Sequence, residues 1–117
     1  MLKIATVPSF PAKVKFKTLG ANGTQVPMEY TAKFKGMTLS DYRTLLRRCT
    51  EAAETGEDGD QKMIDEVLLG WEGVGDENGV PLEFSPQARD ALMDVLGCRA
   101  ATVQTFMASV TGAKQGN

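Results

Sequence analysis

The 117-residue chain contains no histidine. Histidine is the side chain that most often acts as a general base near neutral pH, and it is the commonest protein ligand of transition metals. Its absence excludes Ser-His-Asp and Cys-His catalytic sites together with most zinc and iron sites. We therefore expect a protein that is not an enzyme, with no catalytic residues, no metal site and no cofactor.

Long apolar runs are also missing, and cysteine is scarce. No stretch is long enough to span a membrane, and the N-terminus is too short and too broken by Pro8 and Pro11 to be a signal peptide. We expect a cytoplasmic protein that does not bind membranes. The two cysteines, Cys49 and Cys98, lie on apolar stripes of predicted helices, so we expect two reduced thiols in the core.

Acidic residues are rare in the first half of the chain. Residues 1–50 contain nine Lys/Arg and two acidic residues, whereas residues 51–117 contain four and thirteen. Two explanations remain open: the halves pack on each other within one molecule, or basic and acidic faces of neighbouring subunits meet head to tail. Nucleic-acid binding by the basic half is the less favoured third explanation, because the acidic half would repel phosphate.

Two segments alternate between apolar and polar residues, which is typical of half-buried strands. They are residues 12–18 and 26–35, and the turn-rich segment 19–24 between them predicts an antiparallel hairpin. Pro27 has no N–H for a strand ladder, so it belongs near a strand start or on a free edge. An open edge beside an apolar face is a natural docking surface. Residues 1–11 are expected to form a loosely ordered arm.

Four helices are expected after the hairpin. Thr38 can cap the first helix, with Asp41 reaching back to it. The apolar stripe of that helix is expected to cover the hairpin, and it consists of Leu39, Tyr42, Leu45, Leu46, Cys49 and Ala53. A second helix is expected over residues 61–69, ending at Gly70.

A third helix begins after Ser85, an N-cap residue followed by proline, and is expected to end near Leu96. The fourth is expected over residues 99–111. The predicted fold class is therefore α+β, with an N-terminal antiparallel β-hairpin packed on a bundle of about four short α-helices. The single domain would span residues 12–111, followed by a flexible tail at 112–117.

The segment between the second and third helices contains the only tryptophan. A turn at residues 76–79 should fold this segment back on itself, and the side chains expected to form a structural anchor are Trp71, Val74, Leu82 and Phe84. The same turn does not fit a calcium loop, because that register would place Val74 and Ser85 at ligand positions. Trp71 is either a buried anchor or an exposed contact residue, and we expect burial.

The chain resembles the small tail assembly chaperones of long-tailed phages and prophages. The resemblance spans roughly residues 10–110 and rests on Trp-x-Gly-Val at 71–74, Gly-x-Pro-Leu at 79–82 and Phe-Ser at 84–85, in that order. It also includes the strand-like residues 10–16 and the end of the second strand before the capped helix.

The resemblance implies a hairpin joined to a helical bundle and a protein without enzymatic activity. It also implies binding of the tape measure protein, recruitment of tail tube subunits, and action in the host bacterial cytoplasm. Self-association would fit the opposed charges. The alternative is a structural tail completion or connector protein. The side chains that we select as a possible contact surface are Val26, Met28, Tyr30, Phe106, Met107 and Val110.

Overall fold

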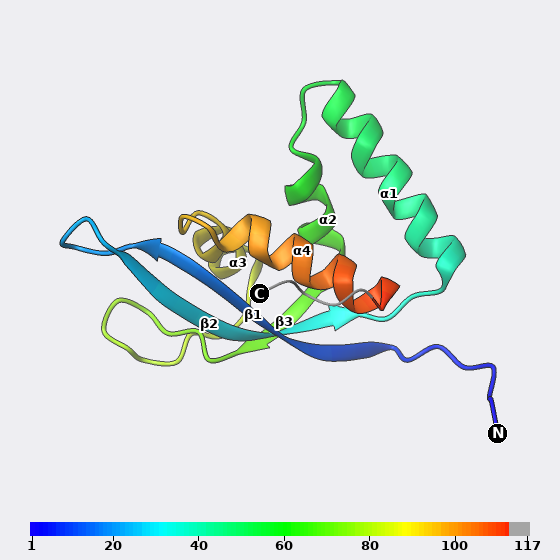
Figure 1. Ribbon diagram of the computed structural model, residues 1–117, viewed down its shortest axis with the longest axis horizontal. Helices are drawn as coiled ribbons and strands as arrows, with labels where there is room; N and C mark the ends of the chain where they lie inside the picture. Colours follow the sequence, from blue (N-terminus) through cyan, green and yellow to red (C-terminus); the bar gives the residue numbers. More distant parts are fainter. Residues whose placement is uncertain (113–117) are drawn as a thin grey trace.

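A long antiparallel hairpin forms the base of the α+β fold. The structure is a computed structural model that describes residues 1–112. Strands β1 (Ser9–Leu19) and β2 (Gln25–Lys35) pair along their whole length, which confirms the predicted hairpin (Figure 1). Residues 9–11 were expected in the N-terminal arm but belong to β1, because the ladder continues to Ser9 opposite Lys35.

A third strand, β3 (Leu68–Glu72), lies on the other side of β2. It runs antiparallel to β2, with Thr31 opposite Glu72 and Lys33 opposite Gly70. The prediction of a helix through residue 69 ending at Gly70 is therefore wrong. Helix α2 (Gly59–Val67) stops before Leu68, whose backbone is already extended and whose chain continues along the open edge of β2.

Two of the other helices begin at the residues that the caps predict. The hydroxyl of Thr38 accepts a hydrogen bond from the Asp41 N–H at the start of α1 (Leu39–Glu54). The hydroxyl of Ser85 accepts a hydrogen bond from the Ala88 N–H at the start of α3 (Pro86–Met93). Helix α3 is shorter than predicted because the chain turns after Met93 and enters α4 (Cys98–Thr111).

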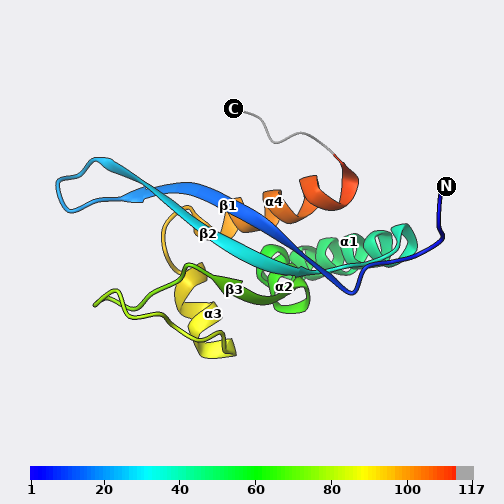
Figure 2. The ribbon, with the colours of Figure 1, turned by 90° about the horizontal axis from the view of Figure 1, so that it is seen from below.

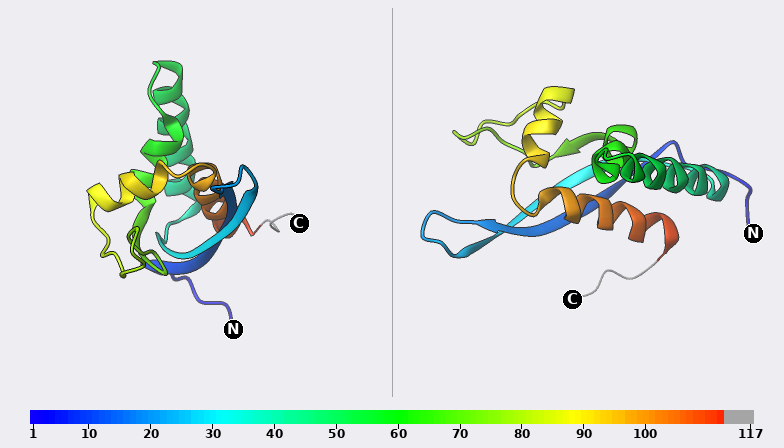
Figure 3. Two further views of the ribbon diagram at one scale, coloured as in Figure 1. Left: turned by 90° about the vertical axis from the view of Figure 1, so that its left-hand side faces the viewer. Right: turned by 90° about the horizontal axis from the view of Figure 1, so that it is seen from above.

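Helix α4, and not α1, covers the hairpin. It packs along β1, whereas α1 packs mainly against α2, and Arg48 on α1 forms an ion pair of 2.8 Å with Glu66 on α2. The close approach of α4 depends on Gly97, where a Cβ would lie 2.6 Å from the carbonyl oxygen of Lys17. All four helices lie on one face of the sheet, and among the described residues no helix lies on the other (Figures 1 and 3).

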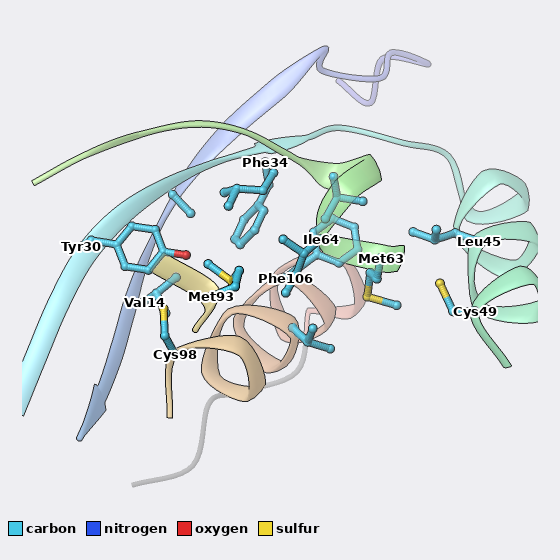
Figure 4. Packing of buried hydrophobic residues seen from close by; sticks show 14 of the residues in the cluster. Val14, Tyr30, Phe34, Leu45, Cys49, Met63, Ile64, Met93, Cys98 and Phe106 are labelled. Carbon is cyan, nitrogen blue, oxygen red and sulfur yellow. The ribbon is translucent and has the colours of Figure 1, made fainter. Parts of the chain in front are cut away.

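The core lies between the sheet and the helices, and all four helices contribute buried side chains to it (Figure 4). The rings of Phe34 and Phe106 meet edge to face with centroids 5.3 Å apart. Cys49 and Cys98 are buried free thiols, as predicted. Within residues 1–112, no helix is long and apolar enough to cross a membrane. The predicted tail lies outside the described residues from 113 onward.

Candidate binding surface

The end of the hairpin extends beyond the helices (Figures 1 and 2). We call residues 16–28 the projecting end. Its inner side carries Val26, which is 38% exposed, and Met28, which is 43% exposed. Half-buried Phe16 lies opposite Met28 in the ladder, and Gly97 at the start of α4 approaches its ring. The cover of the sheet therefore ends at Phe16, and the apolar residues beyond it form an exposed surface suited to a partner.

The opposite side of the hairpin, which we call the outer face, is basic. Its exposed lysines are Lys13, Lys15, Lys17, Lys33 and Lys35. The only acidic residue of the hairpin strands is Glu29, whose carboxylate lies 3.7 Å from the Lys13 ammonium group. One carboxylate offsets the charge of only one of the five lysines, so the outer face stays positive. Such a face attracts acidic partners.

The structure separates the residues that were predicted to form a contact surface. Val26 and Met28 lie on the projecting end. Tyr30 is 4% exposed and Phe106 is fully buried, so the prediction that these two belong to a contact surface is wrong. Both side chains are buried in the contact between α4 and the sheet. Strand periodicity identifies the apolar side of a hairpin but not the residue at which its helical cover ends.

The remaining two predicted contact residues lie near the end of α4. Met107 and Val110 are half-buried. Val110 lines a hollow of about 350 Å³ together with Val7, Phe10 and others. This end of α4 lies near the N-terminal segment, at the opposite end of the molecule from the hairpin turn (Figure 1). The predicted contact residues therefore do not form one surface.

The four residues predicted as an anchor do lie together. The indole N–H of Trp71 donates to the Leu82 carbonyl oxygen at 2.8 Å, and its ring meets the Phe84 ring edge to face at 4.9 Å. The Leu82 N–H in turn donates to the Val74 carbonyl oxygen at 2.9 Å. Trp71 is half-buried, so it holds the folded-back segment against the end of β3 without entering the central core.

A small polar group lies inside the core. The hydroxyl groups of Tyr30 and Thr102 are 2.7 Å apart, and the Cys98 sulfur lies 3.8 Å from the Thr102 hydroxyl. Burial raises the pKa of Tyr30, and it raises the pKa of Cys98 to about 11 despite the opposing effect of the Thr102 hydrogen bond. The thiol is therefore neutral near pH 7 and closed off from solvent, which suits packing and not nucleophilic chemistry.

One of the acidic residues between α1 and α2, Asp58, has a structural role. Asp58 accepts a hydrogen bond from the Gln61 N–H at the start of α2, and its other oxygen pairs with Arg99 on α4 at 2.7 Å. Across the described part of the chain, no group of three or more Cys, Asp and Glu side chains is placed to hold a metal ion.

Sequence reasoning did not select Phe16 as a contact residue. The signal was present, because Phe16 shares the apolar side of its strand with Val14 and lies opposite Met28. Whether Phe16 is exposed depends on where Gly97 lies, and the alternation of residues within the strand carries no information about Gly97.

Comparisons of the chain with protein-family models, curated proteins and solved structures find no match.

Proposed function

We propose that this protein is a non-enzymatic assembly chaperone of a phage tail. In this proposal it acts in the host bacterial cytoplasm, binds the tape measure protein and helps to recruit tail tube subunits. The observation that carries the proposal is the exposed apolar side of the projecting end, formed by Phe16, Val26 and Met28. The resemblance of residues 71–85 to tail assembly chaperones supplies the class of partner.

The chemistry of the projecting end suits a long helical partner. An amphipathic helix buries its apolar stripe when it lies along an apolar groove or face. Met28 is flexible and polarisable, so it adapts to varied apolar side chains. The lysines on the outer face oppose pairing between identical hairpins, which helps to keep an exposed apolar strand pair in solution.

Co-expression tests the proposal. The partner to use is the longest helical product that is encoded next to the gene for this protein. We expect that product to become soluble and to co-purify with this protein, and to be insoluble when produced alone. If it stays insoluble and the two never associate, the chaperone function is contradicted.

A pair of variants connects the result to the projecting end. Val26→Ser combined with Met28→Ser removes the exposed apolar side chains, and we expect the recovery of soluble long product to fall by about tenfold. The matched control is Leu39→Ser on α1, since Leu39 is also an exposed apolar residue, at 62%. Equal losses from both variants would contradict the role of the projecting end.

The alternative, a structural completion or connector protein, predicts a different location. Such a protein stays in the finished particle, whereas an assembly chaperone does not. Mass spectrometry of purified virions distinguishes the two functions, and detection of this chain at a fixed stoichiometry would replace the chaperone proposal.

A further inference from the structure

The N-terminal segment, which we define as residues 1–8, leaves its apolar side chains in solvent. Leu2 is 94% exposed and Ile4 is wholly exposed. In an extended chain, residues two apart point to the same side, so Leu2 and Ile4 can form one apolar stripe. The segment lies at the opposite end of the molecule from the hairpin turn (Figures 1 and 2). Burial of this stripe would be favourable, and it requires a partner surface outside the segment.

The projecting end carries an apolar stripe of the same spacing. Val26 and Met28 are two residues apart on β2, and both are exposed on the inner side of the hairpin. The spacing between such residues is about 7 Å in any extended chain. An extended segment that lies along β2 can therefore place one of its apolar side chains against each of these two residues.

The charges beside the two stripes are opposite in sign. The N-terminal segment contains one charged side chain, Lys3. Exposed Asp60 and Asp94 help to line a hollow of about 410 Å³. Gly97 also lines this hollow, and a Cβ there would lie 3.5 Å from the ring of Phe16, so the hollow adjoins the projecting end. Among residues 1–112, no Lys or Arg nitrogen lies within 4.0 Å of the Asp60 or Asp94 carboxylate. The acidic rim therefore suits a positively charged segment.

The two stripes cannot meet within one molecule. Ile4 lies five positions before the start of β1, so it reaches at most about 18 Å from that point. Met28 lies opposite Phe16, about 23 Å along the strand. Leu2 reaches at most about 25 Å, whereas Val26 lies about 30 Å along the hairpin. Helix α4 packs along β1 between the two ends and lengthens the path further. The segment that meets the projecting end must belong to another molecule.

We propose that the N-terminal segment of one copy of this chain binds along the projecting end of a second copy. Leu2 and Ile4 would pack against Val26 and Met28, and Lys3 would lie near the acidic rim of the hollow. The contact joins opposite ends of the molecule, so it is head to tail and can repeat along a row of copies. This inference does not rest on the proposed function. It adds that a long helical partner would have to displace the N-terminal segment from the same surface.

Intermolecular paramagnetic relaxation tests the proposal. Two apolar side chains form a small contact, so the experiment must detect short-lived complexes. One full-length chain carries a nitroxide label at Ala5→Cys and no ¹⁵N, and a second chain carries ¹⁵N and no nitroxide. The native thiols are buried, so the label attaches at residue 5. We expect the amide signals of Val26, Met28 and Gly97 in the ¹⁵N chain to broaden as the labelled chain is added. Measurement at about 0.3 M salt screens contacts between exposed charged faces.

Variants connect the broadening to the two stripes. Leu2→Ser with Ile4→Ser in the labelled chain should reduce it by about tenfold or more. Val26→Ser with Met28→Ser in the ¹⁵N chain should have the same effect. The matched control is Leu39→Ser in the ¹⁵N chain, which removes an exposed apolar side chain from α1 and should change nothing. Unchanged amide shifts in the core establish that each variant is folded. If the β2 variant does not fold, the variant in the exposed N-terminal segment decides.

Three results would overturn this head-to-tail contact. They are the absence of broadening at every concentration, broadening that survives Leu2→Ser with Ile4→Ser, and broadening that is confined to another surface such as α1. The proposed function is tested separately. The same variant in the N-terminal segment should leave the recovery of soluble long product in co-expression at the wild-type level or above, so failure of one proposal does not imply failure of the other.

Discussion

Tyr30 and Thr102 share a buried hydrogen bond of 2.7 Å that joins the central strand of the sheet to helix α4. Thr102→Val keeps the shape of the side chain but leaves the Tyr30 hydroxyl without this partner. We expect a loss of about 1–3 kcal/mol in the free energy of unfolding, measured by urea denaturation. Tyr30→Phe should also destabilise. The double variant should cost less than the two single variants together, by about 1 kcal/mol, and strict additivity would contradict a direct interaction.

The Trp71 anchor should contribute through both packing and hydrogen bonding. Trp71→Ala removes the contact with Phe84 and the bond to the Leu82 carbonyl oxygen, and we expect a loss of about 3 kcal/mol. Trp71→Phe keeps an aromatic ring without the N–H donor, so it should cost only part of that amount. Melting at the wild-type temperature for Trp71→Ala would show that the anchor does not stabilise the domain.

Two glycines with the same backbone geometry should differ in their sensitivity to alanine. Gly97 and Gly56 have φ angles of 88° and 90°. A Cβ at Gly56 meets nothing within 4 Å, so Gly56→Ala should cost only the left-handed conformation, about 1 kcal/mol. At Gly97 the Cβ would also meet the Lys17 carbonyl oxygen at 2.6 Å, so Gly97→Ala should cost about 3 kcal/mol or more. Equal thermal stability of the two variants would contradict the close approach of α4 to β1.

Alkaline pH should destabilise the protein through Cys98. Burial raises the pKa of this thiol from 9.0 to about 11, so the unfolded chain loses the proton at a lower pH than the folded chain. The contribution to stability is complete below pH 9 and is lost as the pH rises towards 11, by up to about 2–3 kcal/mol. Burial raises the pKa of Tyr30 as well, which adds a loss of the same sign above pH 10.

Urea unfolding across this pH range tests the assignment. Cys98→Ala should reduce the loss of stability between pH 9 and 10. Cys49→Ala is the comparison, because burial raises the pKa of this thiol as well, and we expect Cys98→Ala to remove the larger part of the loss. A pH dependence that is unchanged in Cys98→Ala would exclude this thiol as the cause.

The placement of charge predicts self-association that depends on salt. The acidic turn between α1 and α2 lies far from the sheet, whereas the lysines lie on the outer face of the hairpin (Figure 1). We expect sedimentation to show association that increases with protein concentration and weakens above about 0.1 M salt, where the Debye length falls to about 10 Å. Glu54→Lys with Glu57→Lys should abolish it. A monomer at every salt and protein concentration would contradict head-to-tail contact between charged faces.

Local signals in the sequence predicted much of the fold. Alternation placed Val14 and Phe34 in the core, and the capping residues Thr38 and Ser85 predicted two helix starts to within a residue. Both kinds of signal depend only on residues that are close together in the sequence, so they can be identified without the structure. The anchor around Trp71 could also be predicted from the sequence, since a turn at 76–79 brings its two sides together.

The errors arose where distant segments decide the structure. The apolar residues before Trp71 continue the pattern of a helix, but the unpaired edge of β2 favours an extended strand there. Tyr30 and Val26 belong to the same strand face, yet only Tyr30 is buried because α4 begins beside Phe16. The limits of the exposed surface therefore depend on where one helix meets the sheet, which no local pattern contains.

The packing of Phe10 against Phe106, with ring centroids 6.5 Å apart, has a consequence for biosynthesis. The hairpin is made first and the helix that covers it is made last among the described elements. While the ribosome is still adding residues before Thr111, the inner side of β1 and β2 lacks the cover that α4 supplies. The nascent chain must keep this surface in solution until α4 emerges, so the final fold forms by closing a loop that includes nearly every residue in between.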